Sequence, residues 1–218
     1  MENMSMRKIS FVIVLALFVP LLAAFPETKT FTFSSDKTTI VMAEGKEKTV
    51  LTGNARLTSE SSDITADKIE LFGKDLRYAR CSGTITVLDK EQGIRIKTEN
   101  LFYDRDKKRL VIKAYAEMVD QKNEVVVKGS YFENLADKEI TIIEIGVRIL
   151  QATDDGTLTA RSEFALFDRK NNTLELTGVP VVYKNDNVFK ASRIVVDLDT
   201  DEIQLFGKVS GSVTSEEE

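Results

Sequence analysis

Side chains that could do chemistry are few in this chain of 218 residues. It contains no histidine and a single cysteine, Cys81. These two counts exclude Ser-His-Asp triads, Cys-His pairs, histidine-ligated metal sites, cysteine zinc sites and an intrachain disulfide. Cys81 lies on the same alternating face as Gly83, Ile85 and Val87. This pattern predicts a small buried hydrophobic residue rather than a reactive thiol.

Carboxylates are the remaining chemical groups of interest. Asp197, Asp199 and Asp201 occupy alternate positions, a spacing that could hold calcium. Calcium loops usually also have a glycine and a distal bidentate glutamate, whereas here only Glu202 follows directly, so we interpret the segment as a turn. Paired carboxylates could also serve a hydrolase, but all such pairs fall in expected turns. We therefore expect no enzyme, no catalytic residue, no metal and no cofactor.

Composition and the amino-terminal segment indicate an exported globular protein. The net charge is -5, which disfavours nucleic-acid binding by bulk electrostatics. An almost continuous apolar run, residues 9–25, follows Arg7 and Lys8, as in a secretory signal. Its length is also close to what spans a bilayer. We expect residues 1–25 to be a signal peptide or an N-terminal membrane anchor, and the rest of the chain to lie in the periplasm.

After the first segment, the chain repeats itself about every 31 residues. Successive units begin at Ile64, Ile96, Val127, Leu158 and Phe189. Within each unit, apolar residues alternate with polar ones, and clusters of Asp, Asn, Gly and Lys separate the runs. Period-two alternation predicts β-strands, and those clusters predict turns. The sequence therefore predicts an all-β protein of antiparallel strands about ten residues long.

Alternation also predicts which residues face inward. In one run, Ile143, Ile145, Val147 and Ile149 are expected to share a face. The repeat aligns such positions into three apolar series, which are Cys81, Ile112, Ile143, Leu176 and Leu205; Ile85, Ala116, Val147, Pro180 and Val209; and Val87, Met118, Ile149, Val182 and Gly211. Two interpretations remain open: a dry core, as in other repeat proteins, or an apolar trough that holds an apolar ligand.

Several motifs resemble those of the OstA-like family, which contains the LptA proteins. Residues 51–57 read LTGNARL and residues 64–69 read ITADKI, preceded by FTFSSDK at residues 31–37. Further units, LELTG at residues 174–178 and LFGKV at residues 205–209, repeat the strand-glycine pattern. Each motif alone is weakly specific, but their order, the repeat and the export segment together make the resemblance specific. It covers about Thr30 to Val213.

The resemblance implies both a fold and a function. The expected fold is a twisted, partly open antiparallel β-jellyroll of stacked repeats over residues 30–213, with about 13–16 strands and a disordered acidic tail over residues 214–218. The implied function is to carry lipopolysaccharide, or a related glycolipid, from the inner to the outer membrane through a hydrophobic groove. Implied partners are that lipid, LptC-like inner-membrane and LptD-like outer-membrane jellyrolls, and further copies joined head to tail by edge strands.

The groove-lining residues expected from family position and alternation are all apolar: Phe31, Phe33, Ile85, Val87, Ile112, Met118, Ile143, Val147 and Ile149. For each, plain core packing remains an equal alternative. Two other functions also stay open. The jellyroll could remain anchored to the inner membrane as an LptC-like protein, or the chain could be a structural β-repeat polymer with a dry core.

Overall fold

The computed structural model describes residues 32–60, 62–90, 93–122, 124–153, 156–200 and 202–214. The expected signal or anchor segment, residues 1–25, lies outside these ranges, as do Phe31, Asp201 and most of the acidic tail.

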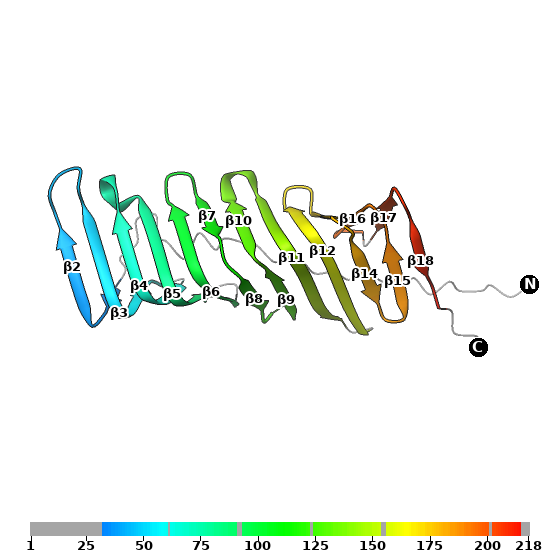
Figure 1. Cartoon of the computed structure of the whole chain (residues 1–218), viewed down its shortest axis with the longest axis horizontal. Coiled ribbons are helices and arrows are strands. Elements are labelled where there is room, and N and C mark those ends of the chain that lie inside the picture. Colours follow the sequence, from blue (N-terminus) through cyan, green and yellow to red (C-terminus); the bar gives the residue numbers. More distant parts are fainter. Residues whose placement is uncertain are drawn as a thin grey trace, which may run out of the picture.

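The described chain is a single antiparallel sheet of 18 strands, accompanied by two short 3-10 turns (Figure 1). The strands are β1 (Thr32–Ser34), β2 (Lys37–Val41), β3 (Lys48–Thr58), β4 (Ser62–Phe72), β5 (Tyr78–Asp89), β6 (Ile94–Asp104), β7 (Arg109–Ile112), β8 (Ala116–Asp120), β9 (Val125–Gly129), β10 (Tyr131–Leu135), β11 (Ile140–Thr153), β12 (Gly156–Asp168), β13 (Thr173–Thr177), β14 (Val181–Lys184), β15 (Asn187–Lys190), β16 (Arg193–Asp197), β17 (Ile203–Phe206) and β18 (Ser210–Ser212). The turns are η2 (Lys74–Leu76) and η3 (Ala136–Lys138). The structure confirms the predicted all-β, antiparallel jellyroll.

The sheet is divided into two halves, and the chain crosses between them along each strand or pair of strands, which explains the higher number of strands. Strands β3, β4, β5, β6, β11 and β12 run through the crossing, several of them with a register shift. The remaining strands are short and come in consecutive pairs, such as β7 and β8, which both pair with β6. Each pair together occupies the length of one expected strand. The predicted strand length therefore fits the long strands and the pairs, and the division of the pairs raises the number of strands.

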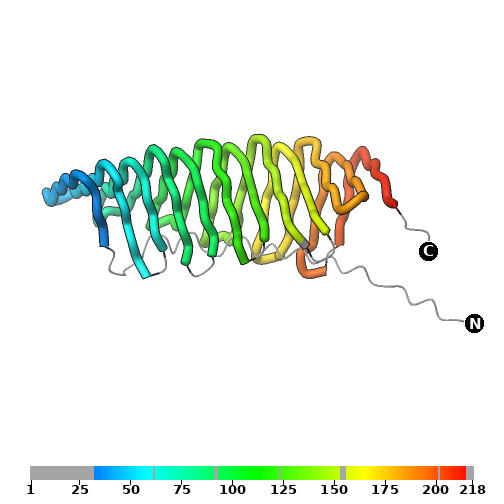
Figure 2. Tube along the Cα trace, turned by 90° about the horizontal axis from the view of Figure 1, so that it is seen from below, coloured from blue at the N-terminus to red at the C-terminus, as the bar shows by residue number. Residues whose placement is uncertain are grey.

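The crossings together form a crease that divides the sheet into two arms. Arm one holds β2, β7, β10, β13, β16 and β17, and arm two holds β1, β8, β9, β14, β15 and β18. Both arms contribute to one hydrophobic cluster, so their inner faces pack against each other. Figure 2 shows the strands stacked along the long axis, with the amino-terminal strands at one end and the carboxy-terminal strands at the other.

Glycine occupies a series of five crossings at near-repeat spacing, beginning with Gly53 and Gly83, because the backbone there adopts positive φ where it meets a neighbouring strand. At Gly83, φ is 89°, and a Cβ atom would overlap the Asp67 carboxylate. At Gly178, φ is 75°, and a Cβ atom would lie 2.6 Å from the Cβ of Glu163. Residues with side chains are rare at such dihedrals and would clash here. Positive φ values mark the crossings at Gly53, Asn54, Gly83, Ile145, Gly146, Gly178, Val179 and Gly207.

An acidic or hydroxyl residue on the neighbouring strand satisfies the backbone groups freed by each bend. The amide of Thr84 donates to Oδ2 of Asp67 over 3.1 Å, and the amide of Lys208 donates to Oγ of Ser192 over 3.2 Å. In the first unit, Nδ2 of Asn54 donates to Asp36 over 3.0 Å. The SD (residues 35–36), AD (residues 66–67) and TGN (residues 52–54) motifs therefore lie at crossings. The acid accepts hydrogen bonds at the bend, and the glycine gives the backbone the positive φ that the bend requires.

One inward assignment from alternation is wrong. Ile145 was expected beside Ile143 and Val147, but it is 59% exposed and has φ of 65°. The register of β11 shifts between Glu144 and Val147, and a bulge adds residues that break strict alternation. Ile145 therefore faces outward, and the inward-facing residues of β11 continue from Val147.

The interior is a single apolar cluster that runs along the stack. Cys81 is completely buried in it, and burial raises the pKa of its thiol to about 12. At neutral pH the thiol is therefore protonated and unreactive. This confirms the prediction of a small buried hydrophobic residue.

Candidate functional site

The strongest candidate site is the apolar interior between the two arms, which is built from two rows of cross-strand neighbours. The row in arm two runs through almost the whole molecule, because each member is the register partner of the next. Its members are Phe33, Leu57, Ile64, Val87, Ile96, Met118, Val127, Ile149, Ala160, Val182, Phe189 and Gly211. We call this set the arm-two row.

A second row lies in arm one. It runs from Leu51 to Leu101 by direct register pairing and resumes from Ile112 to Leu205. Its members are Leu51, Ile69, Cys81, Leu101, Ile112, Phe132, Ile143, Ala165, Leu176, Ile194 and Leu205. We call this set the arm-one row. The two rows give the interior a continuous apolar lining parallel to the long axis.

The structure brings most residues nominated from the sequence into this interior. Phe33, Val87, Met118 and Ile149 belong to the arm-two row, and Ile112 and Ile143 to the arm-one row. Ile85 and Val147 lie beside the crease in the same cluster, and both are buried. Phe31 is outside the described residues. Whether any of these side chains touches lipid stays a prediction.

The interior differs between its middle and its ends. In the middle, side chains of both arms fill the space, so nearly all row members are buried. At the amino-terminal end, Phe33 is 46% exposed, and Ile40 and Val41 are exposed too. At the carboxy-terminal end, Phe206 and Val209 are exposed. Apolar surface is therefore exposed at both ends of the stack, although Phe206 alternates with Leu205 and lies on the outer face beside Arg193.

Polar side chains border the interior of arm two at the end far from the crease. Ser62, Asp89, Asp120, Gln151 and Lys184 are buried at the strand ends, and three of them recur at the repeat spacing. Oδ1 of Asp120 accepts a hydrogen bond of 2.9 Å from the amide of Lys122. Within the described residues, Oε1 of Gln151 is buried without a hydrogen-bond partner. The apolar lining thus ends in a polar rim, which suits an amphiphilic ligand.

The turns of arm one are held by an ion pair. Nε of Arg77 lies 2.9 Å from Oδ1 of Asp104, and Nη2 lies 2.9 Å from Oδ2, so the pair is bidentate. This contact lowers the pKa of Asp104 and raises the pKa of Arg77. Because Asp104 is largely buried, the pair fixes the hairpin between β6 and β7 against that between β4 and β5.

Other charged residues considered at the sequence level serve structural roles. Oδ1 of Asp197 accepts hydrogen bonds from the amides of Asp199 and Thr200, which lowers the pKa of Asp197 and identifies a turn. Nζ of Lys68 lies 2.9 Å from Glu70, and Nη2 of Arg56 lies 3.0 Å from Asp63. In the described part of the chain, no three potential metal ligands gather. No helix there is long and apolar enough to cross a membrane.

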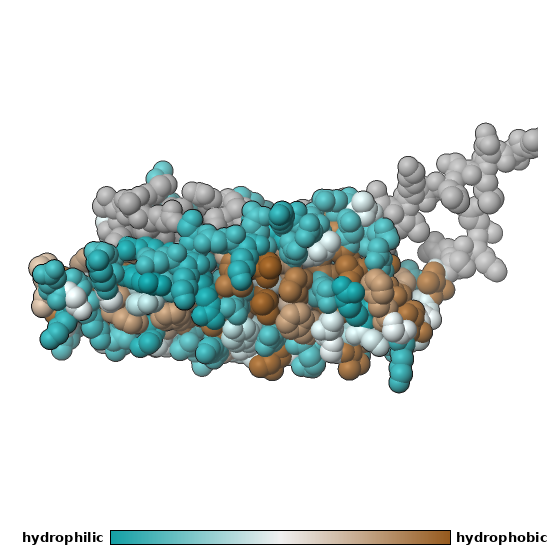
Figure 3. All heavy atoms as spheres, turned by 90° about the horizontal axis from the view of Figure 1, so that it is seen from above, coloured by the Kyte–Doolittle hydropathy of each residue, from teal (hydrophilic) through white to brown (hydrophobic). Residues whose placement is uncertain are grey.

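The outer surface is not uniform along the stack. In the view of Figure 3, hydrophobic side chains gather over the middle and the carboxy-terminal end, whereas the amino-terminal part is mainly hydrophilic. Two exposed hydrophobic residues sit on crossings: Ile145, and Val179, which is 83% exposed with φ of 59°. At the glycine crossings of β3 and β5, the corresponding residues are polar, namely Asn54 and Thr84.

Sequence reasoning missed two features of this molecule. It did not recognise the crossings, although glycines at positions 53, 83, 146, 178 and 207 mark them at near-repeat spacing. It also missed that this series lacks its third member: Ala114 and Tyr115 stand where a glycine between Gly83 and Gly146 would be expected. The absence of one periodic glycine was the signal that could have singled out this crossing.

One protein-family model matches part of the chain. Residues 136–202 match the family model described as "LptA/(LptD N-terminal domain) LPS transport protein". A solved structure of LptH, described as the LptA homologous periplasmic component of the conserved lipopolysaccharide transport device from Pseudomonas aeruginosa, is also similar. It is 11% identical, and the alignment covers 86% of this chain and 96% of that chain, with a TM-score of 0.28. No curated protein sequence matches the chain.

Proposed function

We propose that the chain belongs to the OstA-like family of LptA proteins, whose family model matches residues 136–202, and that it is a periplasmic carrier of lipopolysaccharide or a related glycolipid. In this proposal, acyl chains lie along the two apolar rows while the polar headgroup stays outside the rim. The lipid passes from the inner toward the outer membrane along the stack. The observation that carries the proposal is the arm-two row, which is continuous by register from Phe33 to Gly211.

The energetics suit lipid binding without catalysis. Each methylene removed from water contributes about 0.8 kcal/mol, so an extended apolar lining can hold an acyl chain without any directional bond. Since side chains of the two arms already pack together in the middle, entry requires the arms to separate on the side away from the crease. The exposed apolar residues at the two ends, such as Phe33 and Val209, offer places where this can begin.

The end strands support the proposed assembly of several jellyrolls. Strands β1 and β2 pair only with β3, and β17 and β18 pair only with β16 and β15. Each end therefore presents an unpaired strand edge among the described residues, and such edges pair readily with another sheet. We propose that they join this jellyroll to further copies or to LptC-like and LptD-like jellyrolls, which would make the two rows continuous between molecules.

A photoreactive methionine analogue tests the lipid path within one molecule. Beyond residue 25 the chain has only two methionines, Met42 and Met118. Met118 belongs to the arm-two row and is buried, whereas Met42 is fully on the surface. After labelling with photo-methionine and irradiation with lipopolysaccharide, we expect the lipid adduct to map to Met118. Met118→Leu, which conserves volume, should abolish the adduct, and Met42→Leu should retain it.

The same experiment separates carriage from a structural role. The closely packed middle of the interior favours a second candidate function, a β-repeat polymer with a dry core. Absence of a lipid adduct at Met118, with the protein folded and lipid in excess, would support the polymer and refute carriage. Sequencing the amino terminus of the mature protein distinguishes a soluble carrier, which would begin near Phe25, from an LptC-like anchored one.

A further inference from the structure

The third crossing is built differently from the others. Residues 113–115 form a bend without positive φ, and neither Ala114 nor Tyr115 provides the glycine found elsewhere. Register pairing of β6 with β8 stops at Lys97 with Glu117, and pairing of β6 with β7 begins again at Phe102 with Val111. The backbone is held by Thr98, whose Oγ1 donates to the carbonyl oxygen of Tyr115 over 3.0 Å. The sheet therefore opens locally at this point.

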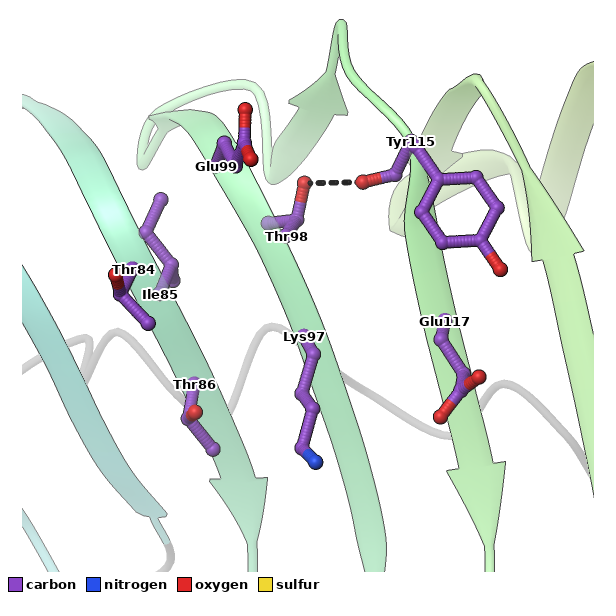
Figure 4. Close-up of a pocket in the computed structure, with 8 residues that line it drawn as sticks. All are labelled: Thr84, Ile85, Thr86, Lys97, Thr98, Glu99, Tyr115 and Glu117. Atoms are coloured by element: carbon purple, nitrogen blue, oxygen red, sulfur yellow. Dashed lines mark hydrogen bonds between the residues drawn. The ribbon is translucent and has the colours of Figure 1, made fainter.

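An open pocket of about 500 Å³ lies where the strands separate (Figure 4). This volume is within the range of small-molecule sites, roughly 300–1,000 Å³. Strand β5 contributes Thr84 and Thr86, and β6 contributes Lys97 and Glu99. Tyr115 and Glu117 complete the polar lining from the bend and from β8. The exposed part of this lining belongs to the outer surface. Two further lining residues, Ile85 and Thr98, are buried, and Ile85 also belongs to the interior cluster, so the floor of the pocket reaches the crease.

Several polar groups in the pocket are unused. Across the described ranges, Lys97 and Glu99 form no ion pair or side-chain hydrogen bond, although the charge of Lys97 helps Lys128 to lower the pKa of the Glu117 carboxyl. Glu117 is the register partner of Lys97 but pairs instead with Lys128, over 2.9 Å. Most other cations on this outer face, including Lys68 and Arg193, are paired with carboxylates. A cation and a carboxylate left free in one pocket can both bind a ligand.

The pocket also exposes an aromatic ring. Tyr115 is 57% exposed, which is the largest exposed fraction of any aromatic residue in the described part of the chain. A flat aromatic face with a polar tip, surrounded by donors and acceptors, suits a ligand that has both an apolar face and hydroxyl groups. Glu99 and Glu117 disfavour a bare phosphate, and Lys97 disfavours a bare cation. A wholly apolar ligand would leave all these charges desolvated without partners.

We infer that this pocket binds a pyranose sugar ring. The apolar face of the ring lies on Tyr115, Glu99 accepts hydrogen bonds from its hydroxyls, and Lys97 donates to its oxygens. Thr84 and Thr86 can act in either role. The inference does not depend on lipid carriage along the apolar rows. The sugar could come from a free saccharide or from the headgroup of a glycolipid, since both present the same ring chemistry.

Calorimetric titration of the full chain tests this site with two kinds of probe. The first titration uses free glucose and glucosamine, and the second uses the water-soluble carbohydrate released from lipopolysaccharide by complete deacylation. We expect saturable binding in at least one titration, weakened tenfold or more in Tyr115→Ala and in Glu99→Gln. Both positions are exposed, so the variants should retain the unfolding midpoint of the parent chain.

Matched variants outside the pocket provide the controls. Tyr183→Ala removes a ring that packs against Arg161, and Glu175→Gln breaks an outer-face ion pair with Arg193. Both should leave the saccharide affinity unchanged. Binding in the first titration identifies a free-saccharide site, and binding only in the second identifies a site for a glycolipid headgroup. No binding in either titration, or equal binding by Tyr115→Ala and the parent chain, would overturn the inference.

Discussion

The second and third crossings show how one repeat can serve two purposes. At the second, Gly83 adopts φ of 89° against Asp67, whose carboxylate accepts the amide of Thr84. The strands stay close, and the acid is used in the bend. At the third, Ala114 and Tyr115 pass the crease without positive φ, and the strands part. The acid of this unit, Glu99, is left free.

This difference indicates that the glycine, rather than the acid, keeps a crossing closed. At the position of closest approach, as at Gly83, a Cβ atom would overlap the neighbouring strand, and here the chain instead takes a wider path of three residues, 113–115. The wider path opens a pocket and exposes the Tyr115 ring. The same replacement in other units would be expected to open the sheet at those crossings.

Exchanging the crossing residues should produce the largest effect. Gly83→Ala forces positive φ on alanine and overlaps Asp67, so we expect a loss of about 2–4 kcal/mol in the free energy of unfolding. Ala114→Gly meets no such constraint and should cost about 0.5–1 kcal/mol through chain entropy. Urea denaturation measures both. Equal losses would mean that the two crossings do not differ as described.

Removing the side chain that holds each bend should have an intermediate effect. Asp67→Ala loses the hydrogen bond to Thr84, and Thr98→Val loses the one to Tyr115. Each should lower the free energy of unfolding by about 1 kcal/mol. In addition, Thr98→Val should weaken saccharide binding because it releases Tyr115, whereas Asp67→Ala should not. If both variants bind alike, Thr98 does not position the ring.

Two ion pairs, one at the turns of arm one and one beside the third crossing, should show the smallest difference in stability, and this difference should depend on pH. Arg77 lowers the pKa of Asp104 below its ordinary value of 3.8, so the charged carboxylate stabilises the fold above that pH. This stabilisation is lost as pH falls through the lower folded pKa. Asp104→Asn should therefore reduce the urea midpoint at pH 7, with the difference vanishing in acid.

Glu117 provides the comparison for Asp104. Its pKa is also lowered, by the hydrogen bond with Lys128, but both partners are about one-third exposed, and solvent screens such pairs. Glu117→Gln should change the midpoint less than Asp104→Asn at pH 7. A larger effect from Glu117→Gln would show that the pocket, rather than the hairpin turns, depends on its charges for stability.

Local pattern was sufficient for most of the fold. Period-two alternation predicted β-strands, turn clusters predicted where they end, and the repeat placed Val87, Met118 and Ile149 in one register, as the pairing shows. Alternation failed at Ile145, because a bulge changes which face a residue occupies and leaves no period-two signature. The strand count differed for the same reason, since crossings divide strands.

The sequence by itself determined the strands, the apolar rows and the burial of Cys81, because these follow from residue spacing along a pleated strand. Only the tertiary structure decided how the arms pack, which leaves the ends of the rows exposed and their middle filled. It also decided that Thr84, Lys97 and Tyr115, distant in sequence, line one pocket. Such a pocket depends on which strands pair and on where their pairing stops. No single motif determines this, because the lining residues come from several strands of neighbouring repeats.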